Sequence, residues 1–371
     1  MKLFPPLAYA ALFCLCPPAA TGAEIESVAG TGEPGFSGDG ASANSAKINN
    51  PFGVELGPGG ELFFCDTGNH VIRKIDRKTG IVTTVAGSGG ERGYSGDGGP
   101  ARKAKLAEPY ELRFDEAGHL FFVEMQNHVV RRVDAETGVI STVAGTGEPG
   151  FSGDGGAATA AKLKRPHSIV LDDGGNLFIC DIGNHRIRRV DVGSGEISTY
   201  CGTGKKQGPA DGAMISPETS LKGPRALAID AAGDLWLALR EGNQIVKFDL
   251  GTQRIHHVAG TGKSGFSGNG GAALEATLSG PKGIVVDDRR QLVYLADTES
   301  HSIRAIDLGT DPPVLRLVAG TGKKGDGPDG DPLRCGLARP HGVGLDPESG
   351  DVFVGDSETH QLRVIRVGTP E

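Results

Sequence analysis

Residues 166–202 read PHSIVLDDGGNLFICDIGNHRIRRVDVGSGEISTYCG, and this stretch decides the fold. It contains four short runs in which apolar and polar residues alternate, separated by clusters of Gly, Asp, Asn and Ser. The runs cover residues 168–171, 176–181, 185–190 and 196–200. Period-two alternation between turn-forming residues predicts consecutive antiparallel strands. A lone four-stranded meander exposes both of its faces to solvent. It therefore requires further copies packed against these faces.

The copies are present along the chain. Each begins at a proline, and successive prolines are 57 to 59 residues apart, at positions 51, 109, 166, 224, 281 and 340. A first strand, an apolar second strand, a third strand and a segment close to TVAG follow in most copies. Six copies in phase predict an all-β fold, a six-bladed β-propeller formed as a single domain by residues 24–371.

The strand count predicts how the ring closes. Residues 24–30, EIESVAG, match the fourth-strand ending but precede the first complete repeat, whereas the last repeat has three strands before position 371. We therefore predict that residues 25–29 pair with the third strand of the sixth repeat. Such closure leaves only short outer edges exposed.

The first 23 residues have a different composition. Lys2 precedes an apolar run at 7–16, and small residues follow at 20–23, which is the order found in secretory signal peptides. The run is too short for a membrane-spanning helix. We expect residues 1–23 to be a signal peptide and the protein to be exported, either periplasmic or secreted, with no membrane span.

Charge and cysteine placement limit the functional classes. The formal net charge is −8, which argues against a nucleic-acid-binding surface. No C-x-x-C motif is present, so the cysteines give no signal for zinc or redox chemistry. Their placement in the repeats predicts buried free thiols at positions 65, 180, 201 and 335.

The third strands carry a family resemblance. They read CDTGNHVIRKID at 65–76, EMQNHVVRRVD at 124–134 and CDIGNHRIRRVD at 180–191, with further copies at 239–249, 296–307 and 355–367. These motifs resemble NHL repeats over nearly the whole mature chain. The resemblance implies that the recurrent acid and histidine belong to the repeat signature. The acids are Asp66, Glu124, Asp181, Asp297 and Asp356, and the histidines are His70, His128, His185, His301 and His360.

These recurrent side chains have two interpretations. A ring of acids could bind a cation, or each acid could hold the adjacent turn, and recurrence in almost every blade favours the structural role for acids and histidines alike. Long loops between blades carry a second acid series, for which we weigh calcium binding against a turn or helix N-cap role, and favour the latter. That series is Asp39, Asp97, Asp154, Asp211 and Asp329. Loop aromatics that we expect to anchor these loops are Phe36, Tyr94, Phe151 and Phe266.

Positions that differ between blades are the candidates for function. The residue after each repeat proline opens the first strand, which lines the central channel of a propeller. The six residues are Phe52, Tyr110, His167, Arg225, Lys282 and His341. We predict a site at the loop-side channel mouth, formed by Tyr110, His167, Arg225, Lys282 and His341, that takes a small anionic ligand or an acidic side chain of a protein partner. The opposite face is expected to carry tight turns with little concavity.

A second resemblance concerns metals. Pro166-His167-Ser168 and Pro340-His341-Gly342 look like the Pro-His-Gly/Ser segments of peptidylglycine amidating lyases, which are similar propellers that bind zinc through three such histidines. This chain has two, so His167 and His341 are candidate metal ligands. Lactonases of the same general architecture use calcium.

Two functional hypotheses follow. The first is an exported ligand- or protein-binding module or scaffold that uses its loop-side face. The alternative is a zinc- or calcium-dependent lyase or hydrolase, amidating-lyase-like or lactonase-like, with its site in the channel. The chain contains no nucleophile elbow or P-loop motif, and whether it is an enzyme stays open at this point.

Overall fold

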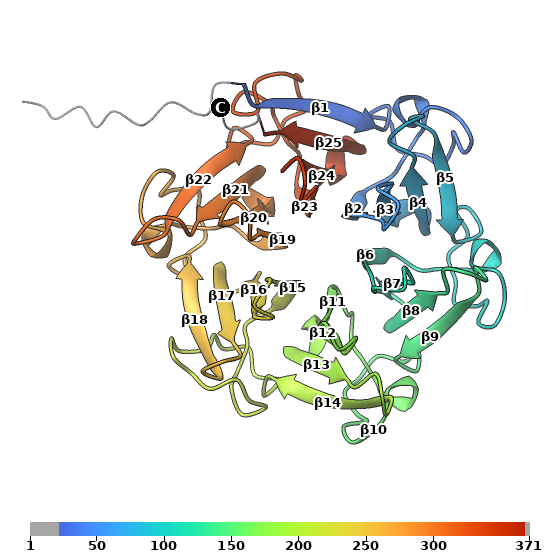
Figure 1. Cartoon of the computed structure of the whole chain (residues 1–371), viewed down its shortest axis with the longest axis horizontal. Coiled ribbons are helices and arrows are strands. Elements are labelled where there is room, and N and C mark those ends of the chain that lie inside the picture. Colours follow the sequence, from blue (N-terminus) through green and yellow to red (C-terminus); the bar gives the residue numbers. More distant parts are fainter. Residues whose placement is uncertain (1–21, 368–371) are drawn as a thin grey trace, which may run out of the picture.

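The computed structural model describes residues 22–367, which form six antiparallel sheets arranged as the blades of a ring (Figure 1). The predicted six-bladed β-propeller is confirmed. The predicted signal peptide lies outside the described residues, apart from its last two positions. Within the described part, no helix is both long and apolar enough to cross a bilayer.

The strands follow the repeat. Blade one contains β2 (Pro51–Leu56), β3 (Leu62–Asp66), β4 (Val71–Ile75) and β5 (Val82–Ala86). Blade two contains β6 (Pro109–Phe114), β7 (Leu120–Glu124), β8 (Val129–Val133) and β9 (Ile140–Ala144). Blade three contains β11 (Ile169–Leu171), β12 (Leu177–Asp181), β13 (Arg186–Val190) and β14 (Glu196–Cys201), with the short β10 (Gly156–Ala157) at its outer edge.

The second half of the ring repeats this order. Blade four contains β15 (Pro224–Ile229), β16 (Leu235–Leu239), β17 (Gln244–Asp249) and β18 (Arg254–Ala259). Blade five contains β19 (Pro281–Asp287), β20 (Leu292–Asp297), β21 (Ser302–Asp307) and β22 (Val314–Ala319). Blade six contains β23 (Pro340–Leu345), β24 (Val352–Asp356) and β25 (Gln361–Arg366).

Short 3-10 turns complete the description. Those in the long loops are η1 (Ala43–Ser45), η3 (Ala101–Lys103), η4 (Ala158–Ala160) and η6 (Ala273–Glu275). Those between second and third strands are η2 (Thr67–Asn69), η5 (Ile182–Asn184), η7 (Thr298–Ser300) and η8 (Ser357–Thr359). The end of the first long loop meets η2, where the Gly68 N–H donates to the Asn49 carbonyl (2.8 Å), whereas the Ala43 N–H of η1 donates to the Gly80 carbonyl in the turn between β4 and β5 (2.9 Å).

The two ends of the propeller meet in blade six. Strand β1 (Glu24–Ala29) pairs antiparallel with β25, with Ile25 opposite Ile365, and becomes the fourth strand of that sheet. The side chain of Ile25 is fully buried. The predicted closure is therefore present in the structure.

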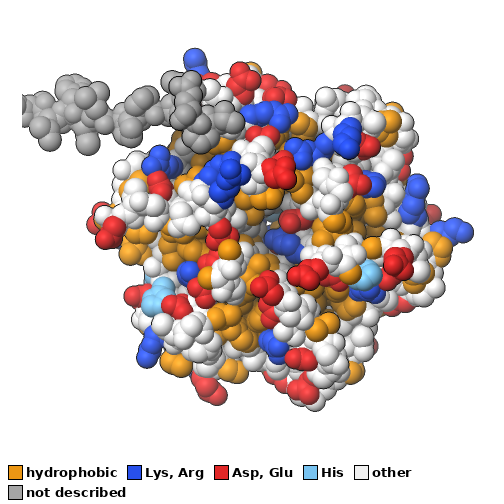
Figure 2. All heavy atoms as spheres, in the orientation of Figure 1, with side chains coloured by type: hydrophobic (Ala, Val, Ile, Leu, Met, Phe, Trp, Pro, Cys, Tyr) orange, Lys and Arg blue, Asp and Glu red, His pale blue; other side chains and the backbone are white. Residues whose placement is uncertain are grey.

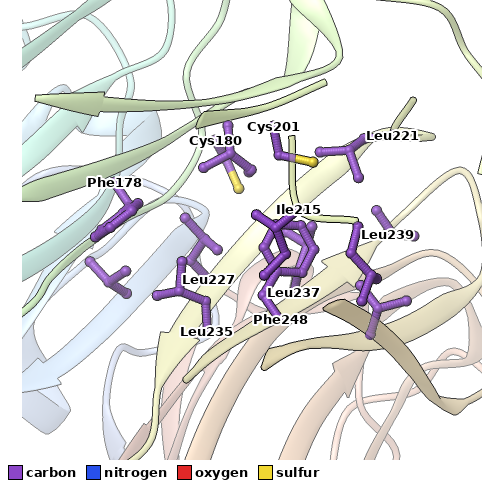
Figure 3. Close-up of a cluster of buried hydrophobic side chains, with 14 residues drawn as sticks. Phe178, Cys180, Cys201, Ile215, Leu221, Leu227, Leu235, Leu237, Leu239 and Phe248 are labelled. Atoms are coloured by element: carbon purple, nitrogen blue, oxygen red, sulfur yellow. The ribbon is translucent and has the colours of Figure 1, made fainter. Parts of the chain in front are cut away.

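The hydrophobic core is divided among the blade interfaces. Figure 3 shows the interface between blades three and four, where Cys180 and Cys201 pack against Leu227, Leu237 and Phe248. Five further clusters of the same kind complete the ring. The four cysteines in the described residues are free and buried, as predicted. Each blade thus buries its faces only against its neighbours.

A buried arginine explains both acid series. In blade two, the side chain of Arg131 is fully buried and donates to Glu124 (Nη1–Oε1, 2.6 Å) and to the loop residue Asp97 (Nη2–Oδ1, 2.7 Å). Glu124 also accepts from the Asn127 side chain (2.6 Å) and the Ala107 N–H (2.7 Å), so it holds the adjacent turn as predicted. The corresponding arginines are Arg73, Arg188, Arg304 and Arg363.

The N-cap prediction for the loop acids is wrong. No side-chain cap bond is present at η1, η3, η4 or η6. Asp39, Asp97, Asp154 and Asp329 pair instead with the buried arginine of their own blade. A buried cation requires a partner, and each long loop passes over the third strand where that partner is needed. Asp211, in blade four, accepts from the His257 N–H.

Blade four has apolar residues in place of the buried acid and the buried arginine. Leu239 replaces the acid and Val246 replaces the arginine, and both side chains are fully buried. One chain therefore contains an ionic and an apolar solution to the same packing problem. Such replacements are often neutral or stabilising when both partners change together.

The repeat histidine joins neighbouring blades. His128 lies in the left-handed region (φ 58°), and its Nδ1 accepts a hydrogen bond from the Arg165 N–H just before the next blade (3.1 Å). Blade four has Asn243 here (φ 51°), whose Oδ1 accepts from the Gly280 N–H (2.9 Å). We call this hydrogen bond between neighbouring blades the histidine clasp. It is also made by His70, His185, His301 and His360. The predicted structural role is thus a link between blades.

The loop aromatics anchor the loops from outside. Phe36 is 40% exposed, lies over the guanidinium of Arg73 (5.2 Å) and is close to Gly89 in the next loop. Any side chain at Gly89 would collide with the ring, and its φ of 82° also favours glycine. The equivalent cation–π pairs are Tyr94 with Arg131, Phe151 with Arg188 and Phe266 with Arg304.

Replacing Arg131 tests the buried pair. We expect Arg131→Val alone to lower the free energy of unfolding by about 3–5 kcal/mol, because Glu124 stays buried without its cation. The double variant Arg131→Val/Glu124→Leu, which copies blade four, should recover most of this loss. Urea unfolding measures both. A double variant as unstable as the single one would contradict this explanation.

Replacing His128 tests the blade clasp. His128→Ala should destabilise the protein by about 1–3 kcal/mol, because the Arg165 N–H loses its acceptor. His128→Asn, which copies Asn243, should be close to the parent. Thermal and urea unfolding at neutral pH distinguish the two, and equal losses would rule out the clasp.

Comparison of the parent with His128→Asn also tests the pH dependence of stability. Burial lowers the pKa of His128, so the folded state favours the neutral ring. The resulting stability is fully present above the ordinary histidine pKa of about 6.5 and is lost as the pH falls toward the lower folded-state pKa. His128→Asn should therefore lose less stability than the parent between neutral and mildly acidic pH.

Candidate functional site

The residues after the six repeat prolines meet at the loop-side end of the channel. Phe52 stacks on His341 (centroids 4.1 Å apart, rings 17° apart), and Tyr110 packs edge-on against His167 (4.5 Å). The guanidinium of Arg225 lies over the Tyr110 ring (4.6 Å) and donates to its hydroxyl. The predicted site residues are thus brought together, as a cluster joined by stacking.

The mouth of the channel is closely packed. Arg225 is 8% exposed and Lys282 is 4% exposed. The free space in the channel beside Phe52, Tyr110, Lys282 and His341 is about 10 Å³. That is room for about one water molecule. The physical reason is convergence: six side chains point at one narrow axis, and the aromatic rings stack there and fill it.

We call the six side chains that meet at the channel mouth the mouth cluster. Its cationic members differ in how many acidic partners they have. Lys282 Nζ contacts Glu299 Oε1 (2.8 Å) and His341 Nε2 (3.3 Å), and burial lowers the pKa of Lys282 to about 7. Glu299 also accepts from Arg339 (2.8 Å). Burial raises the pKa of Glu299, but these hydrogen bonds outweigh it and hold the pKa at about 2.

Arg225 has no carboxylate partner among residues 22–367. Its side-chain hydrogen bond and its cation–π contact there are both with Tyr110, and its Nε has no hydrogen-bond acceptor. Burial therefore lowers the pKa of Arg225. An unpaired buried guanidinium is costly, and such a group calls for an explanation.

The two histidines do not form a zinc site with a third ligand. His167 Nδ1 faces the Arg165 carbonyl (2.6 Å), and His341 Nδ1 faces the Arg339 carbonyl (2.9 Å) and Ser357 Oγ (2.9 Å). The described residues contain no group of three or more His, Cys, Asp or Glu side chains placed to hold a metal ion. Catalytic zinc takes three protein ligands, so this donor set does not fit.

The first strands carry a second polar cluster deeper in the channel. Arg113 Nη2 contacts Glu111 Oε1 (2.5 Å), and Arg113 Nη1 lies 3.4 Å from Glu55 Oε2. Ser168 Oγ donates to Glu111 (2.9 Å) and accepts from the Leu227 N–H (2.9 Å). Burial raises the pKa of Glu111 to about 7.

Below this cluster the channel widens. A cavity of about 210 Å³ lies at the end opposite the long loops, lined by Glu55, Arg113 and a wall of aliphatic residues. The expectation that this face lacks concavity is therefore wrong. A hollow is visible at the centre of the ring in Figure 2, with basic and acidic side chains close together among hydrophobic ones. The sequence feature that indicates this cavity is the fourth residue after each repeat proline. These residues are Glu55, Arg113, Val170, Ala228, Val285 and Gly344.

Comparisons with known sequences agree with the repeat pattern. An NHL repeat model matches residues 163–190 and 337–365. Protein SUPPRESSOR OF QUENCHING 1, chloroplastic, of Arabidopsis thaliana is 29% identical over 306 residues, which is 79% of this chain and 28% of that protein. Human NHL repeat-containing protein 2 is 23% identical over 341 residues, which is 83% of this chain and 45% of that protein. The chain thus spans less than half the length of these relatives.

Solved structures share the fold at low identity. An auxiliary nutrient binding protein from Bacteroides thetaiotaomicron superposes with a TM-score of 0.67 at 16% identity, covering 93% of this chain and 76% of that one. A gluconolactonase from Xanthomonas campestris superposes with a TM-score of 0.58 at 11% identity, covering 94% and 90%. The fold defines a six-bladed β-propeller. Two of its six repeats match the NHL repeat model.

Proposed function

We propose that this propeller is a binding module whose loop-side face takes an anionic group, from a small ligand or an acidic side chain of a protein partner. The observation that carries the proposal is Arg225, a buried guanidinium with no carboxylate partner in the described chain. A bound anion would supply the missing charge and offset the desolvation of this side chain.

The surroundings of Arg225 support an anion. Lys282, Arg240 and Arg339 lie around it, with Glu241 and Glu299 as the neighbouring acids. This cationic mouth stands in a protein of net charge −8. Because Arg225 and Lys282 are nearly covered, the anion must enter by displacing part of the mouth cluster or by contacting it from the rim, where Arg240 and Arg339 are about one third exposed.

The setting and the alternative are also part of the proposal. The predicted signal peptide at 1–23 supports export, which would present the loop-side face to external ligands. The metal-dependent lyase or hydrolase stays a hypothesis from the sequence, because no donor set at the two histidines supports it. A nutrient-binding description belongs to a structural neighbour that shares only the fold.

The test replaces the unpaired cation. Arg225→Met removes the charge and keeps an unbranched apolar side chain, so we expect the melting temperature to be unchanged or higher. The parent should be stabilised by citrate and by poly-glutamate at constant ionic strength, and Arg225→Met should lose most of this rise. Differential scanning calorimetry measures both effects.

The matched control is Arg254→Met, which removes an exposed arginine on the outer strand β18. This variant should keep the anion response of the parent. If Arg225→Met responds to both anions as strongly as Arg254→Met does, the loop-side mouth is not an anion site.

A further inference from the structure

The cavity at the other end of the channel has two unlike walls. Strands β2 and β6 contribute the charged side chains of Glu55 and Arg113, together with the ring of Phe114. Strands β11, β15 and β19 contribute an aliphatic wall made of Val170, Leu171, Ala228, Ile229, Ile284, Val285 and Val286. One side of the cavity is therefore polar and the other is apolar, which is the composition of a site for a small amphipathic molecule.

The acidic side chains at and beside the polar wall outnumber the basic ones. Arg113 is engaged by Glu111 through the short Nη2–Oε1 contact (2.5 Å), and it also donates to the Leu112 carbonyl (2.7 Å). Glu55 makes one polar contact within the described chain, the longer one to Arg113 Nη1 (3.4 Å). When both carboxylates are ionised, they and the single guanidinium leave a net charge of −1 beside the cavity.

The position of Glu55 allows its carboxylate to contact a ligand in the cavity. Its side chain is 31% exposed, and it borders the cavity. Burial in the channel raises the pKa of Glu55, because few groups solvate its charged form. A cation in the cavity would favour the ionised carboxylate and fill its free acceptor positions.

We infer that this cavity binds a small organic ammonium ion with an apolar body. The ammonium group contacts the Glu55 carboxylate, and the hydrocarbon part lies against the aliphatic wall of β11, β15 and β19. Burial of the hydrocarbon supplies affinity, and the ion pair supplies selectivity for a cation. This site is separate from the loop-side mouth and does not depend on the function proposed for it.

The test uses three probes of equal length: n-hexylammonium, 1-hexanol and hexanoate, each titrated into the full chain by calorimetry. We expect n-hexylammonium to bind at least tenfold more tightly than 1-hexanol, and hexanoate to bind least. Glu55→Gln keeps the shape of the side chain and removes its charge. This variant should weaken n-hexylammonium at least tenfold and leave 1-hexanol nearly unchanged.

A second variant tests the location. Val285→Phe extends a ring into the cavity from the aliphatic wall and should weaken n-hexylammonium and 1-hexanol alike. The titrations are repeated on Arg225→Met, which removes the proposed anion site at the other end of the channel, so any hexanoate binding that remains reports on the cavity. The inference fails if n-hexylammonium does not bind the parent, if hexanoate binds Arg225→Met as tightly as n-hexylammonium does, or if Glu55→Gln binds the ammonium as the parent does.

Discussion

Contact between neighbouring blades is the constraint on which the rest of this structure depends. A single four-stranded blade is apolar on both faces, and those faces are covered only by the blades beside it. The repeat histidine, or Asn243 in blade four, adds a hydrogen bond across each of these interfaces, from one second-to-third-strand turn to the start of the next blade. No blade can therefore complete its core alone, and the closing pair of β1 and β25 is as important as any interior contact.

Repetition separates structural residues from functional ones in this chain. Side chains that recur in almost every blade, such as Arg131, Glu124 and His128, are buried and paired within the ring. Blade four replaces the ion pair by Leu239 and Val246 and still packs fully, which shows that the position requires filling and not charge. The channel-lining positions differ between blades, and their differences place Arg225 and Lys282 at one end of the channel and a cavity lined by Glu55, Arg113 and aliphatic residues at the other.

Much of the fold was predictable because strand period and repeat length are local properties of the sequence. The proline spacing gave six blades, and the unmatched segment at 24–30 gave the closure with β25. The site was only partly predictable. That Tyr110, His167 and Arg225 converge follows from the repeat, but that they stack and fill the axis depends on side-chain geometry in a ring of this radius. The loop acids were misassigned because their partner, Arg131 or its equivalent, lies 34 residues away in sequence.

Hydrogen exchange on a chain that begins at Thr31 is the most direct test of blade interdependence. Such a chain lacks β1 and leaves β25 as an unpaired edge of blade six. We expect faster exchange and a lower melting temperature across all six blades, because a core shared between neighbours is lost cooperatively. Faster exchange confined to β25, with the parent's protection elsewhere and an unchanged melting temperature, would contradict the interdependence of the blades.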